Sequence, residues 1–259
     1  MPATVTTRAG PRIGGLTPFT SIDYPGKLSA VVYVQGCPWR CAYCHNQHLQ
    51  ARDAPAGPAW PALRTWLQGR RGLLDAVVFS GGEPTVDAAL GLAMDEVRAL
   101  SFAVGLHSAG MYPRRLRSVL SRADWVGLDV KAPLDDDALH ECITGVAGGT
   151  AAVRESLCAV RDAGIAYEVR TTAHASLLDD AALLRLAGSV ASLGVTRYAL
   201  QLARTAGASP SRALNYPADS TIERLRTMFV HFTLRANCLD QPLDFSRHPK
   251  LTREARKCR

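Results

Sequence analysis

The sequence predicts an α/β fold in which six strand-and-helix units follow one another along a chain of 259 residues. Runs rich in β-branched and aromatic residues alternate with segments whose apolar residues recur at helical spacing. Most strand-like runs are hydrophobic almost throughout, as expected for strands buried on both faces of a parallel sheet. Such a series builds a sheet closed or partly closed into a barrel, or an open doubly wound sheet.

Six strands are expected from the strand-like runs. Their ranges are Leu28–Gln35, Ala76–Ser80, Phe102–His107, Trp125–Val130, Tyr167–Thr172 and Tyr198–Leu202. Between and after them, apolar residues at spacings of three and four predict helices. The helical faces run from Trp60 to Leu67, Val86 to Leu100, Pro113 to Leu120, Val153 to Val160, Leu183 to Val190 and Leu225 to Phe229.

Residues that favour helix ends flank several of these faces. Thr150 is expected to cap the helix that Gly164 ends, and Gly194 to end the following helix. Ser220 and Glu223 have the spacing of a capping box, which predicts a helix start there.

No Gly-, Pro- or Ser-rich linker divides the chain, so we expect a single domain over residues 13–240. A loose terminus (1–12) would precede it, and a basic tail (241–259) would follow it. That tail holds much of the formal net charge of +7, which we expect to be solvated. Contact with an acidic partner is the alternative; nucleic acid is not expected, because basic and aromatic residues do not interleave regularly.

The hydrophobic runs and the number of cysteines indicate the cellular compartment of the protein. No apolar run is long enough to span a bilayer, so no membrane association is expected. The first twelve residues lack the apolar core of a secretory signal. The chain has seven cysteines, an odd number, so no disulfide framework is expected. This indicates a reducing compartment, the cytoplasm.

Polar motifs occur at the carboxyl end of every expected strand, where parallel α/β folds build their sites. In chain order they are Cys37–Cys44, Ser80–Pro84, His107–Gly110, Asp129–Pro133, Arg170–His174 and Gln201–Arg204. Their convergence on one end of a sheet indicates a functional site more strongly than any single motif.

The first motif, Cys37, Cys41 and Cys44, packs three thiols into eight residues. A zinc site with His45 or His48 as fourth ligand is one interpretation, although no second ligand pair is present. Reactive thiols without metal are another. An iron–sulfur cluster held by three thiolates would leave one iron free to bind a ligand from outside the protein.

Charged residues at two later strand ends are further candidates. Asp129 and Lys131 alternate with Val130, so their side chains should point to the same side, as an internal ion pair or as ligand contacts. Arg170 can meet a carboxylate through two parallel hydrogen bonds or form a surface ion pair. His107 and His174 are expected to pack in the interior.

The cysteine spacing, with an aromatic residue just before the last cysteine, resembles the radical S-adenosylmethionine (SAM) superfamily. The resemblance implies a partial (β/α)6 TIM-like barrel and a [4Fe–4S] cluster whose open iron binds SAM. One electron then cleaves the sulfonium C–S bond, giving methionine and a 5′-deoxyadenosyl radical. In that superfamily a Gly-Gly-Glu segment, here Gly81–Glu83, holds the amino group of SAM.

Other segments resemble the glycyl-radical-enzyme activases, which include pyruvate formate-lyase activating enzyme. These segments are Gln35–Cys37, Tyr43–Asn46 and Asp23–Gly26, the last with Tyr24 in place of a glycine. Gly14–Phe19 and Leu128–Pro133 look most like proteins classed as anaerobic ribonucleoside-triphosphate reductase activating proteins. The third strand end has Ser108-Ala109-Gly110 where the activases have Thr-Asn-Gly.

The resemblance assigns roles to individual residues. Cys37, Cys41 and Cys44 would ligate the cluster. The SAM pocket would comprise Tyr43, His45, Gly81, Gly82, Glu83, Asp129, Val130, Lys131, Arg170 and Gln201. No catalytic residue beyond the cluster and SAM is assigned.

The resemblance also implies partners: a glycyl-radical enzyme as protein substrate and an electron donor such as flavodoxin or ferredoxin. No cysteine group for an auxiliary cluster occurs after the first helix or near the C-terminus. A radical SAM enzyme acting on a small molecule or nucleotide is the alternative within the same chemistry. A non-catalytic zinc-binding interaction module is the alternative of another class.

Overall fold

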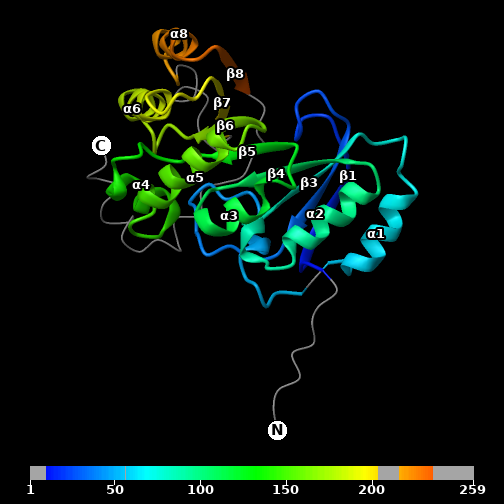
Figure 1. Cartoon of the computed structure of the whole chain (residues 1–259). Helices are drawn as coiled ribbons and strands as arrows, with labels where there is room; N and C mark the ends of the chain where they lie inside the picture. Colours follow the sequence, from blue (N-terminus) through cyan, green and yellow to red (C-terminus); the bar gives the residue numbers. More distant parts are fainter. Residues whose placement is uncertain (1–9, 56, 204–215, 236–259) are drawn as a thin grey trace. The chain divides into compact units, whose positions relative to one another are not determined.

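A computed structural model of the protein describes residues 10–55, 57–203 and 216–235. Its strands form one mostly parallel sheet in the order β1 to β8, with β1 antiparallel to β2 (Figure 1). The sheet is open rather than closed, consistent with a partial TIM-like barrel. The strands are β1 (Ile13–Thr20), β2 (Ser29–Val34), β3 (Ala76–Gly81), β4 (Ala103–Ser108), β5 (Trp125–Asp129), β6 (Ala166–Ala173), β7 (Arg197–Leu202) and β8 (His231–Arg235).

All six predicted strands are present as β2 to β7. Each predicted helical face has its α-helix, but Val86 lies in a separate 3-10 helix, and Leu100 and Phe229 lie just beyond the ends of their helices. The α-helices are α1 (Trp60–Gln68), α2 (Leu90–Ala99), α3 (Pro113–Leu120), α4 (Asp137–Thr144), α5 (Thr150–Asp162), α6 (Asp180–Ala191) and α8 (Asp219–Met228). Two short 3-10 helices are η1 (Gln47–Leu49) and η2 (Pro84–Val86). The strands β1 and β8 and the helix α4 were not predicted.

Two predicted helix caps are wrong. Thr150 is the first residue of α5, and its hydroxyl donates to the Asp137 carboxylate at 2.7 Å instead of capping its own helix. Ser220 lies inside α8, whose N-cap is Ala218 without a side-chain hydrogen bond. In both cases the expected cap residue lies inside the first turn, so its side chain cannot perform the N-cap role.

The chain divides into two compact units. The first comprises the chain up to Cys37, His48–Ser108 and Arg114–Val126; the second comprises Pro38–Gln47, Ala109–Pro113 and the chain from Gly127. Whether residues 13–240 behave as one domain stays a prediction. The expected tail, 241–259, lies outside the described residues, as do residues 1–9 of the expected loose terminus. Arg12, in the same expected terminus, is hydrogen bonded to Asp87 through its N–H (2.9 Å).

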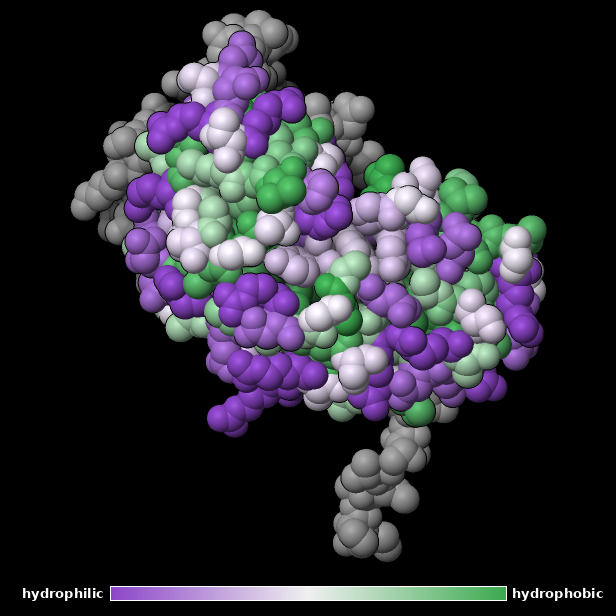
Figure 2. All heavy atoms as spheres, turned by 45° about the horizontal axis from the view of Figure 1, so that its top comes forward, coloured by the Kyte–Doolittle hydropathy of each residue, from purple (hydrophilic) through white to green (hydrophobic). Residues whose placement is uncertain are grey.

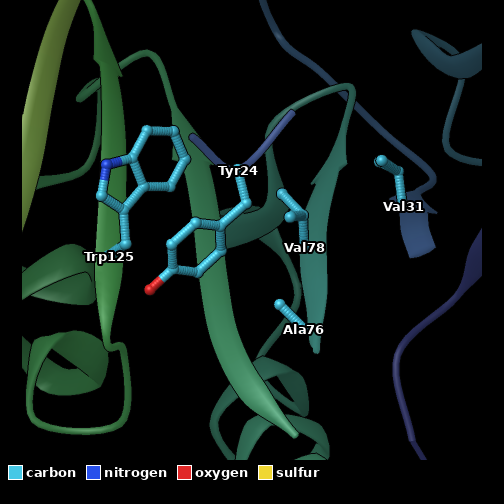
Figure 3. Close-up of a cluster of buried hydrophobic side chains, with 5 residues drawn as sticks. All are labelled: Tyr24, Val31, Ala76, Val78 and Trp125. Carbon is cyan, nitrogen blue, oxygen red and sulfur yellow. The ribbon is translucent and has the colours of Figure 1, made fainter. Parts of the chain in front are cut away.

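The core of the first unit includes an aromatic contact beside β2 to β5. Tyr24, in the turn after β1, stacks on Trp125 with ring centroids 5.1 Å apart (Figure 3). Val31, Ala76 and Val78 complete this buried cluster. The turn after β1 is therefore anchored on the sheet by a large buried side chain at a position where the activases have glycine.

In the second unit, the middle residues of β6 and β7 are buried, as expected for inner parallel strands. Tyr198 on β7 is 1% exposed and stacks on Phe229 with ring centroids 4.5 Å apart. The helices α6 and α8 contribute apolar faces that include Leu186 and Leu225, both fully buried. This packing provides a rigid support for the side chains at the ends of β5, β6 and β7.

The visible surface mixes hydrophilic and hydrophobic residues (Figure 2). Among the described residues, the most exposed large apolar side chains are Ile22 at 76% and Val230 at 75%. None of the helices in the described ranges is long and apolar enough to cross a membrane.

Candidate functional site

In the first unit, the start of the cysteine loop (residues 36–47) is fixed at the end of β2. The N–H groups of Gly36 and Cys37 donate to carbonyl oxygens in the segment 48–51 at 2.7 and 3.0 Å. The buried Gln35 amide donates to two further carbonyl oxygens of that segment, at 3.0 and 2.6 Å. Both ends of the loop are thereby joined at its base, which limits the positions that Cys37 can take.

The Gly81-Gly82 segment after β3 packs directly against this base. Gly81 has a φ of +128°, and a Cβ there would overlap the β2 backbone. A Cβ on Gly82 would lie 2.9 Å from the Cβ of Cys37 and would overlap the carbonyl group of Gly36. The Glu83 N–H donates to that same carbonyl at 2.9 Å. Two predicted strand-end motifs therefore meet in the first unit, as expected.

The Glu83 carboxylate points into the protein interior. It is fully buried, and its Oε1 accepts hydrogen bonds from the Thr85 N–H (3.1 Å), the Thr85 hydroxyl (2.6 Å) and the Ser108 hydroxyl (2.9 Å). Ser108 ends β4, so this carboxylate joins a third strand-end motif to the other two. The Gly82 and Glu83 N–H groups already donate to carbonyl oxygens of Val34 and Gly36. The groups by which this segment can contact a ligand are therefore its backbone C=O groups rather than the Glu83 side chain.

In the second unit, Cys41 and Cys44 form a tight turn in which the Cys44 N–H donates to the Cys41 carbonyl at 3.0 Å. Burial raises the pKa of the Cys41 thiol to about 11, although the nearby Lys131 ammonium opposes that rise. A positively charged metal centre bound to this sulfur would favour the thiolate and reverse the shift.

Asp129 is the centre of a charged group at the ends of β5 and β6. Its Oδ1 accepts from Arg170, with Nε and Nη2 each at 2.8 Å, and its Oδ2 lies 3.5 Å from the Lys131 ammonium. Asp129 and Lys131 share one side of the strand, as predicted. The carboxylate that Arg170 meets is Asp129, and both of its contacts go to the single oxygen Oδ1.

Two cations and one carboxylate leave this group with an excess positive charge. Lys131 and Arg170 are only 11% and 9% exposed in their side chains. Burial lowers the pKa of Lys131, but the acidic groups of Tyr43 and Asp129 outweigh burial and raise it. The ammonium therefore stays charged, and it lies 5.6 Å from the centroid of the Tyr43 ring. Such a group suits an anionic ligand.

Tyr43 and His45 are the two other loop residues predicted to contact a ligand. Among the described residues, the buried Tyr43 hydroxyl has no hydrogen-bond partner, and burial raises its pKa above the ordinary value. The pKa of His45 is lowered, first by burial and then by Lys131, so its imidazole is neutral at pH 7. An unpaired buried hydroxyl next to a buried cation indicates a polar partner outside the described part of the chain.

The remaining predicted residues lie on β5 to β7 or in the core. Val130 is fully buried, and its N–H donates to the Arg170 carbonyl at 2.8 Å. Gln201 lies on β7 in register with Thr172 of β6. As expected, His107 packs in the interior; its Nε2 lies 2.8 Å from the Asp23 carbonyl oxygen.

Sequence reasoning missed α4, which contacts the cysteine loop in the second unit. Asp136 caps this helix by accepting from the Leu139 N–H at 2.9 Å, and Gly145 ends it with a φ of +73°. An aspartate before a helical face and a glycine after it are standard helix signals. These two residues are the signal in the sequence from which α4 can be predicted.

The donor set fits an iron–sulfur cluster. All three motif cysteines are partly accessible, and thiolates are the usual ligands of such clusters. Within the described ranges, no three His, Cys, Asp or Glu side chains form a group suited to a single metal ion. A [4Fe–4S] cube binds one thiolate per iron, so its ligands need not converge on one point.

The comparisons with known proteins agree with this chemistry. Residues 31–187, more than half of the chain, match the family model described as the Radical SAM superfamily. The chain therefore belongs to the Radical SAM superfamily. Membership implies one [4Fe–4S] cluster and SAM as cofactors, and it identifies the chain as a radical SAM oxidoreductase. The zinc-binding interaction module is thereby set aside.

Two curated relatives are named as activating enzymes. A protein of Methanocaldococcus jannaschii, named as a glycyl-radical enzyme activating enzyme, is 30% identical over 48% of this chain and 51% of its own length. A pyruvate formate-lyase-activating enzyme of Clostridium pasteurianum is 29% identical over 65% of this chain and 71% of its own length. The chain thus spans about half the length of the first relative.

Solved structures share the fold at low sequence identity. QueE from Escherichia coli matches with a TM-score of 0.53 and 17% identity, over 87% of this chain and 94% of that one. SuiB from Streptococcus suis, bound to its precursor peptide, matches with a TM-score of 0.59 and 14% identity, over 85% of this chain and 50% of that one. These similarities concern the fold alone.

Proposed function

We propose that the protein activates a glycyl-radical enzyme by installing a radical on a glycine of that partner. The observation that carries the proposal is that curated relatives matching half to two thirds of the chain are named as activating enzymes. The segment before the first predicted strand and the segment around the three cysteines also resemble the glycyl-radical-enzyme activases. The proposed partner is an anaerobic ribonucleotide reductase, because Gly14–Phe19 and Leu128–Pro133 resemble its activating proteins.

In this proposal Cys37, Cys41 and Cys44 ligate the [4Fe–4S] cluster. When bound, the cluster supplies one electron that cleaves the C–S bond of SAM to give methionine and a 5′-deoxyadenosyl radical. That radical would take a hydrogen atom from the partner's glycine, giving 5′-deoxyadenosine and a glycyl radical. An external one-electron donor such as flavodoxin or ferredoxin replaces the electron, which is consistent with a reducing cytoplasm.

The chain's own residues bind and orient SAM. The Lys131 and Arg170 cations, only partly neutralised by Asp129, attract its carboxylate. The backbone carbonyl groups of the Gly81–Glu83 segment accept from its ammonium group. The remaining contacts proposed for SAM come from Tyr43, His45, Val130 and Gln201.

The buried carboxylate of Glu83 would contribute by holding its segment in place. A segment whose backbone is fixed before the ligand arrives loses less entropy on binding. The proposal therefore assigns Glu83 to the SAM site through its backbone, with its side chain as the anchor.

Electron paramagnetic resonance tests the activase assignment. The full chain is reconstituted anaerobically with iron and sulfide and then mixed with SAM, a reductant and a candidate anaerobic ribonucleotide reductase. A glycyl radical signal in the reductase supports the proposal, and its loss when the reductase glycine is replaced by alanine identifies the site. SAM cleavage without such a signal in any glycyl-radical enzyme would refute the activase role and favour a small-molecule or nucleotide substrate.

A further inference from the structure

Within the second unit, the cysteine loop is bound to the carboxyl end of α4. The N–H groups of Arg40 and Ala42 flank Cys41 in the sequence, and they donate to the last two carbonyl groups of the helix. The Arg40 N–H lies 2.7 Å from the Thr144 oxygen, and the Ala42 N–H lies 3.1 Å from the Ile143 oxygen.

The end of α4 requires such partners. The last carbonyl groups of a helix have no acceptor role within it, and here Ile143 and Thr144 are fully buried. Two earlier carbonyl groups of α4 have partners within the helix end: that of His140 accepts from the Thr144 hydroxyl at 2.8 Å, and that of Glu141 accepts from the Gly145 N–H at 2.8 Å. The loop N–H groups therefore satisfy carbonyl oxygens that would otherwise be buried without a partner.

A contact between two buried rings reinforces this junction. Trp39, at the start of the loop, is 4% exposed, and His140 on α4 is 2% exposed. Their rings meet edge to face, with centroids 4.9 Å apart and planes at 80°. The His140 ring also lies close to Gly149, where a Cβ would overlap the imidazole. His140 is thus packed against both Trp39 and Gly149.

We propose that α4 is a clamp that keeps the Arg40 and Ala42 N–H groups away from the sulfur atoms of the cluster. The edge-to-face contact of His140 with Trp39 holds the clamp closed. The inference rests on the proposed function, since it assumes a cluster on this loop. His140 and Trp39 are positioning residues, because neither touches the ligand in this account.

The consequence is electrostatic. An N–H group that donates to a cluster sulfur stabilises the reduced, more negative cluster and raises its reduction potential. A backbone N–H already engaged by a carbonyl at 2.7 Å has little capacity to donate elsewhere. By engaging both groups, α4 keeps the cluster strongly reducing, which favours electron transfer to a sulfonium.

Amide hydrogen exchange tests the clamp in the full-length chain before reconstitution. In His140→Ala, we expect the amides of residues 39–42 to exchange about tenfold faster than in the wild type, while those of α6 keep their rates. Alanine favours helix more than histidine, so faster exchange would not come from a weakened α4. Unchanged exchange at residues 39–42 would overturn the proposal.

Further variants separate the ring contact from general damage to the fold. His140→Phe keeps a ring against Trp39 and should restore wild-type protection of the loop. Gly149→Ala displaces the imidazole without altering the loop or the helix sequence and should act like His140→Ala. Ala138→Gln, on the exposed face of α4, is the matched control and should change nothing. Loss of protection in this control equal to that in His140→Ala would contradict the clamp.

The midpoint potential of the reconstituted cluster is the second readout. We expect it to rise in His140→Ala and Gly149→Ala and to stay at the wild-type value in His140→Phe and Ala138→Gln. An unchanged or lower potential in His140→Ala would overturn the electrostatic role. If the wild type binds no cluster, the proposed function fails, and hydrogen exchange still decides whether α4 holds the loop.

Discussion

The Ser108 hydroxyl donates to the Glu83 carboxylate at 2.9 Å in the interior of the first unit. This hydrogen bond joins the end of β4 to the segment after β3, and that segment packs against Cys37. Ser108 stands where the activases have the threonine of Thr-Asn-Gly. A hydroxyl group is therefore kept at this position, even though the next residue is Ala109 rather than asparagine.

Replacing Ser108 by alanine should leave the buried Glu83 carboxylate short of one donor. Removing one partner of a buried, charged hydrogen bond costs about 1–3 kcal/mol. We expect the free energy of unfolding of Ser108→Ala to fall by that amount in urea denaturation. Ser118→Ala, which removes an exposed helical hydroxyl, is the control and should stay close to the wild type. Equal stability of the two variants would contradict the anchoring role of Ser108.

The ion pair of Arg170 with Asp129 should contribute more to the free energy of unfolding than an exposed ion pair of the same type. In Arg170→Gln, the Asp129 carboxylate loses its contacts with the guanidinium, while the more distant Lys131 stays in place. We expect the free energy of unfolding to fall by about 2–3 kcal/mol, which is below the full cost of breaking a buried pair because Asp129 is partly exposed. In Arg185→Gln, which breaks the exposed pair with Asp136, the loss should be below about 1 kcal/mol. Chemical denaturation of both variants measures the difference, and similar losses would refute it.

Two buried histidines predict a loss of stability in mild acid. Burial lowers the pKa values of His140 and His174, and the buried Nε2 atom of each has no hydrogen-bond partner within the described ranges. As pH falls below about 6.5, the unfolded chain binds protons that the folded chain does not, so the free energy of unfolding decreases.

Urea denaturation between pH 8 and pH 5.5 measures this effect. The slope should be shallower in His174→Gln, which removes one of the two groups. The Asp87 carboxylate should affect stability in a different pH range from the two histidines. Burial tends to raise its pKa, but hydrogen bonds from Arg12, Ala89 and Arg52 outweigh burial and lower it. Its contribution is therefore lost only as pH falls below its ordinary value, near 4. A slope in His174→Gln identical to the wild type would contradict the assignment.

Tyr24 should contribute stability through its ring. Tyr24→Ala would leave a cavity beside Trp125, and we expect a loss of about 3–5 kcal/mol in the free energy of unfolding. Tyr24→Phe keeps the ring and should cost much less. Phe19→Ala, at a side chain 58% exposed, is the control for loss of an aromatic residue. A cost for Tyr24→Ala as small as that for Phe19→Ala would show that the stacking does not anchor the turn.

The inner strands could be predicted because burial on both faces makes a sequence continuously hydrophobic. The edge strand β1 contains Gly14, Gly15 and Pro18, residues that read as loop, and the short edge strand β8 is mostly exposed. Edge strands carry a weaker pattern, since only one side is paired and fewer side chains must be buried.

Some features of the candidate site come from residues close in the sequence, and others come from residues far apart in it. The cysteine spacing and the alternation of Asp129 with Lys131 are local, so the sequence displays them directly. The hydrogen bond from Ser108 to Glu83 spans 25 positions, and the pair of Arg170 with Asp129 spans 41. Such partners are set by the order and register of the strands. No short stretch of the sequence shows either of these.

The most direct test of the central claim is SAM cleavage by the anaerobically reconstituted full chain under a strong reductant. The account predicts about four irons and four sulfides per chain, with methionine and 5′-deoxyadenosine formed in equal amounts. Cys41→Ala should abolish cleavage, whereas Cys158→Ala, a cysteine on α5, should not. A fully loaded wild-type cluster that leaves SAM intact would contradict the account.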